Sequence, residues 1–357
     1  MSRWTIEKAR QWRQGQPWRV GCNFIPSTAV NQLEMWQADS YDPSTIDREL
    51  DWAESLGFNA LRVFLHDLVW RDDRDGFLGR MDDFLSRAHR HGMAVMPVFF
   101  DDCHRPEPVA GPQPPPVRGV HNSGWVHSPG QRLVRQVYDD SISPEDRARL
   151  KRYIQDVLRH FDRDERIWVW DLYNEPGQSG NGDRTLPLLR LVWEWALEIR
   201  PAQPLTACLD GAVGEKNIAL NRDYSDMVTF HSYDKKHFDE RVNSIEAEVG
   251  GRPVACTEYM AREHGTTFEY CLPVFLQHRT DAFNWGLVAG KTQTHFNWKT
   301  VADLERRRAE GDFLRPGDPI PEPPIWHHDI FRPDGTPYDP NEVDFIRRFL
   351  RAARGTA

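Results

Sequence analysis

Features typical of membrane proteins and of nucleic-acid-binding proteins are missing from the 357 residues of this chain. No run of about 20 apolar residues occurs, so we expect no membrane-spanning helix. Basic residues are not in excess, because 45 Lys and Arg are scattered among 54 Asp and Glu and the net charge is -9. Since nucleic acids and anionic membrane surfaces both attract a basic face, we expect neither as a partner.

Cysteine is scarce, with five widely spaced residues and no Cys-x-x-Cys pair. An odd number of dispersed cysteines predicts free thiols and a reducing compartment. The N-terminus lacks the apolar segment and the small-residue cleavage site of a secretory signal. We therefore expect a cytoplasmic protein.

Sequence motifs for metal and nucleotide chemistry are also missing. Although the chain has 14 His, it contains no HExxH motif, no Cys/His knuckle and no Asp-rich calcium loop. The run His327-His328-Asp329 is suggestive, but adjacent side chains point in different directions. No Walker loop, dinucleotide fingerprint or Gly-x-Ser-x-Gly elbow occurs. We therefore expect no cofactor and no catalytic metal.

Aromatic residues are plentiful, and 14 Trp, 18 Phe and 9 Tyr provide ample apolar surface for a core. Short β-branched or aromatic runs alternate with longer amphipathic segments, as in proteins that alternate strands and helices. The predicted strands are Arg19–Pro26, Asn59–Leu65, Ala94–Phe100, Ile167–Tyr173, Pro204–Leu209, Met227–His231, Pro253–Thr257 and Ala282–Val288. The predicted helices are Ser44–Leu56, Gly79–His91, Ser143–His160, Leu186–Ile199, Asp239–Val249 and Glu342–Arg354.

Eight strands alternating with helices predict a (β/α)8 TIM barrel, formed by a single domain over residues 1–357. The rival fold, a doubly wound open sheet, usually has a Gly-rich phosphate loop after its first strand, and none follows here. Ser44 is expected to cap the first helix, with Asp47 three residues further on, and Gly92 to follow the end of the second.

Two Pro-rich segments, Asp101–Asp140 and Pro316–Pro340, are predicted to be ordered loops. The first follows the third strand, which places it on the C-terminal face of a barrel. We expect extended loops there, because aromatic residues and His are interleaved with the prolines.

Two strands end in a glutamate. The fourth runs Trp-Asp-Leu-Tyr-Asn-Glu-Pro to Glu175 and Pro176, and the seventh runs Val-Ala-Cys-Thr-Glu to Glu258. The C-terminal ends of barrel strands hold catalytic groups, so the two carboxylates can converge across the barrel mouth. Such a pair suits a reaction that needs one proton donor and one nucleophile.

Other strand ends supply side chains for a pocket. Arg62 lies within an apolar strand, where a buried guanidinium needs a carboxylate, and it could lower the pKa of Glu258. His231 and Tyr233 have period-2 spacing and so face the same side of the sixth strand. Trp285, on the eighth strand, could stack on a sugar ring.

Most of the 14 Trp, such as Trp193 and Trp195, are expected to be core residues that pack helices. Trp125, in the segment after the third strand, could close one side of the site. Trp298 and Trp326 are weaker candidates for the same role.

The order of these motifs along the chain resembles glycoside hydrolase family 5, whose clan comprises (β/α)8 retaining glycosidases with catalytic Glu on the fourth and seventh strands. The resemblance runs from about Val20 to about Val288 and rests on Arg62, Asn174-Glu175-Pro176, His231-x-Tyr233, Glu258 and Trp285. Members also carry a His near the end of the third strand, for which His104 and His121 are both candidates. The Pro-rich insertion departs from the short loop of simple cellulases.

The resemblance implies that Glu175 is the general acid/base and Glu258 the nucleophile of a two-step mechanism with retained configuration. It implies carboxylates about 5–5.5 Å apart. The other residues would hold the sugar or support the nucleophile: Asn174 at the 2-hydroxyl, Arg62 and Tyr233 beside Glu258, and His231 next to the cut bond.

The expected partner is a small oligosaccharide. Endo-acting enzymes are usually secreted and have an open cleft, whereas the bulky insertions here favour a blocked pocket. The chain looks more like the β-mannosidase subgroup, which trims β-linked mannose from glycans of the mannosyl-N-acetylglucosamine type. Alternatives are an endo-β-1,4-glucanase, mannanase or xylanase of the same family, another exo-β-glycosidase, a transglycosylase, a catalytically inactive sugar-binding barrel, and a metal-dependent barrel enzyme.

Overall fold

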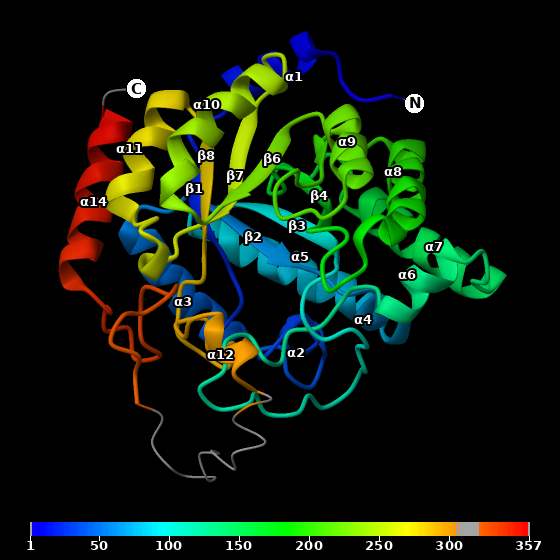
Figure 1. The fold of residues 1–357 in the computed structure, drawn as a ribbon, viewed down its shortest axis with the longest axis horizontal. Helices are drawn as coiled ribbons and strands as arrows, with labels where there is room; N and C mark the ends of the chain where they lie inside the picture. Colours follow the sequence, from blue (N-terminus) through cyan, green and yellow to red (C-terminus); the bar gives the residue numbers. More distant parts are fainter. Residues whose placement is uncertain (1, 305, 307–320, 356–357) are drawn as a thin grey trace.

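Eight parallel strands form the centre of the computed structural model, which describes residues 2–304, 306 and 321–355 (Figure 1). Neighbouring strands follow the order β5-β4-β3-β2-β1-β8-β7-β6, so the first strand of the chain pairs with the last. The two edges are joined by the Leu209 amide, just after β5, which donates to the carbonyl of Thr229 in β6 at 2.8 Å. The strands are β1 (Val20–Asn23), β2 (Ala60–Phe64), β3 (Ala94–Asp101), β4 (Trp170–Asn174), β5 (Leu205–Thr206), β6 (Val228–Ser232), β7 (Val254–Tyr259) and β8 (Asp281–Trp285).

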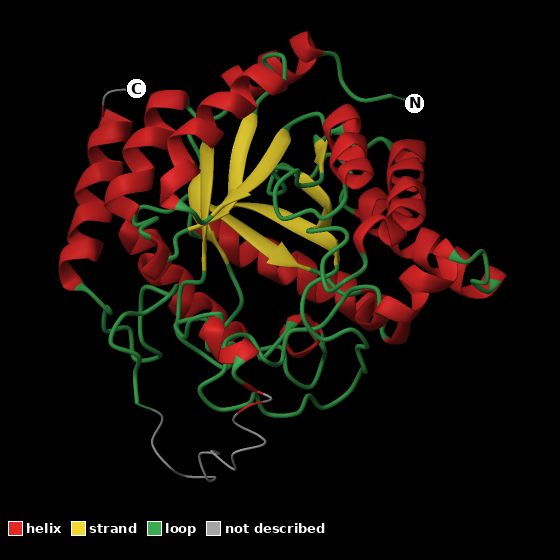
Figure 2. Ribbon diagram, in the orientation of Figure 1, coloured by secondary structure: helices red, strands yellow, loops and turns green. Residues whose placement is uncertain are grey.

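Helices surround this barrel on the outside (Figure 2). The chain therefore forms the predicted (β/α)8 barrel and not a doubly wound sheet. The longer helices are α3 (Pro43–Leu56), α5 (Arg74–Arg90), α7 (Pro144–His160), α8 (Leu186–Ile199), α9 (Glu215–Tyr224), α10 (Phe238–Glu248), α11 (Phe268–His278) and α14 (Pro340–Gly355). The shorter ones are α1 (Ile6–Gln14), α2 (Gln32–Trp36), α4 (Asp67–Asp72), α6 (Gln131–Tyr138) and α12 (Lys299–Ala302).

The alternation of side chains along a strand decides what the barrel interior contains. In β2, Leu61 and Val63 belong to the large core between strands and helices. Ala60 and Phe64 lie in two smaller clusters, one at each end of the interior. Because side chains alternate with a period of two, Arg62 shares the inner face with them, halfway up the barrel.

Trp12 of α1 closes the N-terminal end of the barrel. Its ring stacks on Trp168 at 6.0 Å between centroids, and Trp168 lies 5.7 Å from Phe283 of β8. Helix α1 lies on the opposite side of the molecule from α2, α12 and the loop after β3 (Figure 1). The apolar floor thus leaves the other end of the interior for polar groups.

The helix termini differ from the sequence prediction at one cap. Asp42, not Ser44, caps α3, because its side chain accepts a hydrogen bond from the Thr45 amide while Ser44 donates to the same carboxylate. An ionised Asp is the stronger acceptor at a helix N-terminus. Gly92 follows α5 in a left-handed conformation, with φ of 69°, as predicted.

The segment Asp101–Asp140 is not a loop throughout, because its last part forms α6. The prolines stop at Pro129, and the residues of α6 contain neither Pro nor Gly. Of the second Pro-rich segment, residues 316–320 lie outside the described residues, and residues 321–339 form turns and bridges without a helix.

All five cysteines are free thiols in this fold. Within the described ranges, no helix is both long enough and apolar enough to cross a membrane.

Candidate active site

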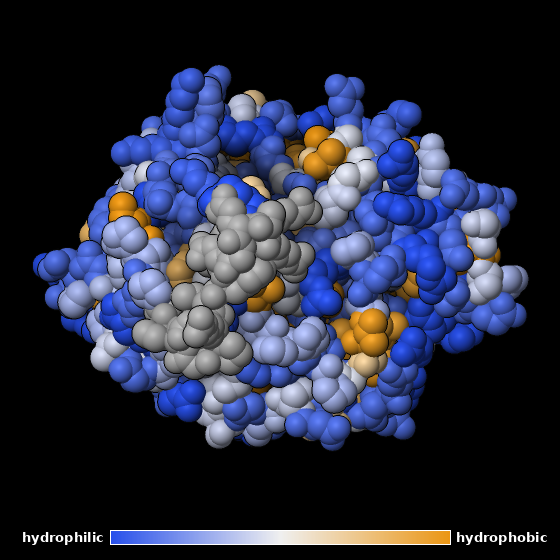
Figure 3. All heavy atoms as spheres, turned by 60° about the horizontal axis from the view of Figure 1, so that its bottom comes forward, coloured by the Kyte–Doolittle hydropathy of each residue, from blue (hydrophilic) through white to orange (hydrophobic). Residues whose placement is uncertain are grey.

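A cavity of about 530 Å³ opens at the C-terminal ends of the strands. Figure 3 turns this side of the molecule forward, and the described atoms on it are mostly polar with scattered apolar patches. The lining residues are Cys103, His104, His121, Asn122, Trp125, Asn174, Glu175, Gln178, Ser179, Tyr233, Glu258, Trp285, Trp298 and His328.

The structure brings the two predicted carboxylates together in this cavity. Glu175 directly follows β4 and has a left-handed backbone with φ of 43°, a conformation that costs energy for a residue with a side chain. Glu258 lies within β7. One carboxylate oxygen of each and Nδ1 of His231 all lie within 4.8 Å of one another.

Arg62 is completely buried below the carboxylates and satisfies several acceptors at once. Its Nη1 donates to Glu258 Oε1 at 2.9 Å and to Asn23 Oδ1 at 2.8 Å. Its Nε and Nη2 both donate to Asp171 Oδ2, and Nη2 also donates to Asn174 Oδ1 at 2.7 Å. One guanidinium therefore fixes four side chains from three strands.

Glu258 is surrounded by groups that favour its charged form. Tyr233 donates its hydroxyl to Glu258 Oε2 at 2.9 Å, and Arg62 occupies the other oxygen. Burial and the charge of Glu175 raise the pKa of Glu258 to about 7, while His231, Arg62 and Tyr233 act in the opposite direction. The guanidinium and the phenol hydroxyl that donate to its two oxygens suit Glu258 to the role of the ionised carboxylate.

Glu175 has weaker partners. The Cys103 thiol donates to Glu175 Oε2 at 3.1 Å, and His231 Nδ1 lies 2.8 Å from Oε1. Burial raises the pKa of Glu175 to about 7, against a smaller lowering by Cys103 and Arg62. Burial also lowers the pKa of His231, and a neutral ring that carries its hydrogen on Nδ1 donates to Glu175. Two carboxyls in unlike surroundings can divide acid and nucleophile roles.

Asn174 is held between Arg62 and Asp101. Its Nδ2 donates to Asp101 Oδ1 at 3.0 Å, which fixes the orientation of the amide. Asp101 also accepts from Trp125 Nε1 at 2.6 Å, and burial raises its pKa to about 7. The predicted residues Asn174 and Trp125 thus share one buried carboxyl.

Both histidines predicted after the third strand line the cavity. The rings of His104 and His121 lie 6.3 Å apart, and His121 Nδ1 is 2.7 Å from the carbonyl of Phe296. Burial lowers the pKa of His104 to about 4 and that of His121 well below its ordinary value. Both rings are therefore neutral, and the geometry does not choose between them.

Three of the four tryptophan candidates line the cavity, and the fourth does not. Trp125, Trp285 and Trp298 line the cavity. Trp326 instead lies 5.0 Å from Tyr338 in a stacked pair and is 1% exposed, so it belongs to the packing beneath the loop after β8.

The site residues that the sequence prediction missed include Asp101, Cys103, Asp171, Gln178 and Ser179. Asp171 stands in an otherwise apolar and aromatic strand, and Asp101 ends another one. A carboxylate in such a run needs a buried partner, which was the available signal. The roles of Cys103, and of Gln178 and Ser179 after β4, depend on contacts across the barrel that no local pattern reveals.

The spacing of Glu175, His231 and Glu258 is also that of a metal-binding group. Arg62, however, donates to Glu258 and has no exposed surface, so a cation at this point would face a buried guanidinium. Both Glu258 oxygens already accept hydrogen bonds from Arg62 and Tyr233. These residues therefore fit a metal ion poorly.

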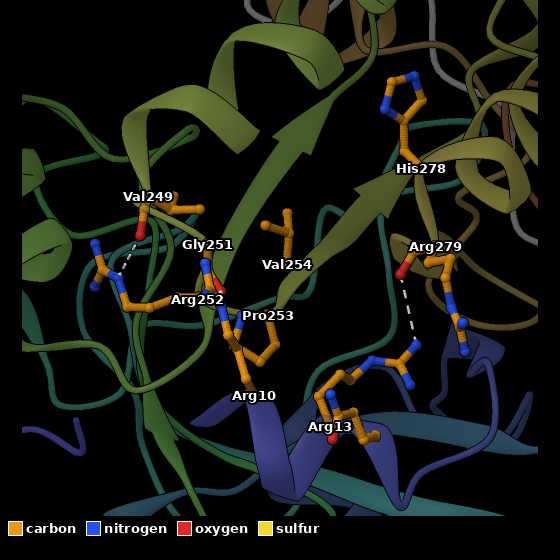
Figure 4. A pocket seen from close by; sticks show the side chains of 10 residues that line it. Arg10, Arg13, Val249, Gly251, Arg252, Pro253, Val254, His278 and Arg279 are labelled. Atoms are coloured by element: carbon orange, nitrogen blue, oxygen red, sulfur yellow. Dashed lines mark hydrogen bonds between the residues drawn. The ribbon is translucent and has the colours of Figure 1, made fainter. Parts of the chain in front are cut away.

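A second large cavity, of about 580 Å³, lies at the opposite end of β7 (Figure 4). Four arginines line it, and no acidic residue does. Arg252 Nε donates to the Val249 carbonyl at 3.0 Å, Arg13 to the Arg279 carbonyl at 3.5 Å, and Arg10 to the turn before β7. Because carbonyls near the ends of helices attract cations, Arg252 and Arg13 stabilise the ends of α10 and α11.

Comparison with known proteins places this geometry in context. No family model matches the chain, and no curated protein does. A GH5_18 protein from Streptomyces cattleya, solved with GlcNAc, is similar over 96% of this chain and 82% of its own, with 14% identity and a TM-score of 0.62.

Two other solved structures are similar as well. The exo-β-1,4-mannosidase Op5Man5 of an Opitutaceae bacterium matches 95% of this chain and 60% of its own, with 16% identity and a TM-score of 0.61. An endo-1,4-β-D-mannanase from Thermotoga petrophila matches 94% and 100%, with 14% identity and a TM-score of 0.56. The chain thus has the fold of family 5 glycoside hydrolases.

Proposed function

We propose that this chain is a retaining β-glycosidase that removes one terminal mannose from a short β-linked oligosaccharide of the mannosyl-N-acetylglucosamine type. The observation that carries the proposal is the carboxylate pair. Oxygens of Glu175 and Glu258 lie within 4.8 Å of each other at the barrel mouth. Retaining glycosidases have carboxyl groups about 5–5.5 Å apart, and inverting ones about 6.5–9.5 Å apart.

The reaction has two displacements. A carboxylate oxygen of Glu258 attacks the anomeric carbon while the carbon–oxygen bond to the leaving group breaks and Glu175 gives its proton to that oxygen. Glu175, now ionised, then takes a proton from water, whose oxygen displaces Glu258 from the sugar. Both steps pass through positive charge at the anomeric carbon, which the anionic carboxylates stabilise.

The surrounding groups support these two roles. Arg62 and Tyr233 lower the pKa of Glu258 against the effect of burial and so favour the carboxylate form that can attack. Burial keeps Glu175 protonated up to about pH 7. The Asn174 amide, held by Arg62 and Asp101, is placed beside the acid to bind a sugar hydroxyl, and Trp285 offers an aromatic face for the ring.

The substrate class is supported by the relatives and by the shape of the site. GH5_18 structures similar to this chain were solved with Manβ1-4GlcNAc, with identities of 13%. The cavity is bounded by the loops after β3 and β8, whose residues His121, Trp125, Trp298 and His328 line it. Such a bounded pocket suits a short glycan better than a polysaccharide chain.

Two substitutions test the catalytic roles. Glu258→Ala is expected to lower turnover at least about 10⁴-fold, because the covalent intermediate cannot form. Glu175→Ala is expected to spare aryl glycosides with acidic leaving groups far more than the natural disaccharide, since such groups need no proton. The assay is a panel of aryl β-glycosides and Manβ1-4GlcNAc, with product anomers followed by NMR.

Glu49→Gln is a matched control. Glu49 is a fully buried glutamate on α3 whose pKa burial also raises to about 7, but it binds the Ser27 amide and not the cavity. Its loss should leave turnover within a few-fold of the wild type. Sugar binding without turnover in the wild type would favour an inactive sugar-binding barrel, and an inverted product anomer would refute the mechanism.

A further inference from the structure

We infer that Trp125 ends the substrate pocket on the side that receives the terminal sugar, and thereby restricts the enzyme to releasing one sugar at a time. The inference rests on the proposed glycosidase function and names the residue that sets its exo action. It follows from where the leaving group must lie, from the packing of Trp125, and from the space behind it.

The two carboxylates set the direction of the substrate. Because Glu175 protonates the leaving oxygen, the departing part of the glycan lies on the Glu175 side of the cavity. Glu175 follows β4, and in a closed barrel of eight strands β8 stands opposite β4. The sugar that stays on the enzyme therefore lies toward β8, over Trp285.

Aromatic side chains fill the space on that side. Trp125 lies 5.0 Å from Phe64 of β2 and 5.7 Å from Trp285, measured between ring centroids, and Phe64 lies 5.7 Å from Trp285. All three pairs are edge-to-face, so the rings interlock. Trp125 is 2% exposed and Phe64 3% exposed, and the wall they form is closed to solvent.

Behind this wall there is no room for a second sugar. The void bounded by Phe64, Trp125 and Trp285 on one side and by residues of β1 and the β8 loop on the other measures about 10 Å³. A space of that size holds about one water molecule. A glycan that continued past the terminal sugar would have to displace Trp125.

Trp125 is not free to move aside. Its indole Nε1 donates to the buried Asp101 at 2.6 Å, and its carbonyl accepts from the Arg105 amide at 3.1 Å. The preceding Gly124 packs so closely that a Cβ there would lie 2.2 Å from a methyl group of Val30. One hydrogen bond thus fixes the ring and two contacts fix the backbone that carries it, so the wall is a fixed part of the pocket.

The experiment uses 4-nitrophenyl β-mannobioside, from which release of the terminal sugar gives mannose and 4-nitrophenyl mannoside, whereas binding of both sugars on the far side of the cut bond gives mannobiose and 4-nitrophenol. The initial products are separated by chromatography. We expect the wild type to release mannose first and no mannobiose. Trp125→Ala opens the wall and should make mannobiose an initial product. Trp125→Phe, which keeps a ring but loses the bond to Asp101, should still release mannose alone.

Two further variants make the result decisive. Phe64→Ala opens the same wall from β2 and should also yield mannobiose, which covers the case in which Trp125→Ala fails to fold. Trp298→Ala, on the other side of the cavity, should change the rate without yielding mannobiose. Initial mannobiose from the wild type, or mannose alone from both wall-opening variants, would overturn the inference. A wild type inactive on every β-glycoside would instead refute the proposed function.

Discussion

Replacing Arg62 by methionine tests the polar interior of the barrel most directly. The guanidinium and its partner Asp171 are completely buried, and Glu258 is 7% exposed, so the variant leaves two carboxylates without their cation. Removing one partner of a buried ion pair costs about 3–5 kcal/mol. For a chain of this size, that loss should lower the unfolding temperature by about 4–7 °C.

The loss of stability in Arg62→Met should be greater at high pH than at low pH. Burial already raises the pKa of Asp171 in the native protein, and Arg62 opposes that rise. Without Arg62 the pKa in the folded state rises further, while that of the unfolded chain stays near 3.9. Because the folded variant then binds protons more tightly than the unfolded one, its stability falls as pH rises above about 4. The variant should thus be more destabilised at pH 8 than at pH 5.

Urea denaturation at pH 5 and pH 8, followed by tryptophan fluorescence, measures the loss in unfolding free energy and its dependence on pH. The double variant Arg62→Met with Asp171→Asn should regain part of the stability at pH 8, because the amide carries no charge. Arg87→Met is the control, since Arg87 pairs with Asp83 and Asp47 on partly exposed helix surfaces and should cost less than about 1 kcal/mol. A loss below about 1 kcal/mol for Arg62→Met, or one equal at both pH values, would refute the reasoning.

Two further predictions concern the acid. Activity should fall above about pH 7, as Glu175 loses its proton, and should fall at low pH, as Glu258 gains one. A profile of kcat/KM from pH 4 to 9 measures both limbs, and a rate still rising at pH 9 would contradict the assignment. In Cys103→Ala, Glu175 loses a hydrogen bond that lowers its pKa, so the alkaline limb should move to higher pH. Cys271→Ala, a buried thiol in the large core, should leave the limb in place.

The barrel and its carboxylate pair were predictable because both are encoded locally. Apolar runs such as the one preceding Glu258 end where a polar side chain meets the barrel mouth, and eight such runs occur at the spacing of alternating helices. A strand-terminal Glu is placed by its own strand, whatever the rest of the chain does. The sequence therefore sufficed to bring Glu175 and Glu258 into one cavity.

Two of the longer helices escaped prediction for physical reasons. Helix α9 buries Asn217 and Asn221, whose amides donate to backbone carbonyls, so it shows little apolar periodicity. Helix α11 contains Pro273, which argues against a helix in any local reading. The exposed proline is tolerated because the opposite face of α11, with Phe268, Leu272 and others, is buried in the core.

The site residues that escaped prediction also explain how specificity and rate are linked. Asp101 accepts hydrogen bonds from Trp125, which closes the pocket, and from Asn174, which stands beside the acid. Cys103, two residues further on, donates its amide to Asp101 and its thiol to Glu175. A change that moves Trp125 therefore also shifts Asp101 and, with it, the Asn174 amide. For this reason, a variant that opens the wall should lose turnover as it gains longer products. Because Trp125→Phe removes the hydrogen bond but keeps the ring, it should reduce turnover while leaving the product pattern unchanged.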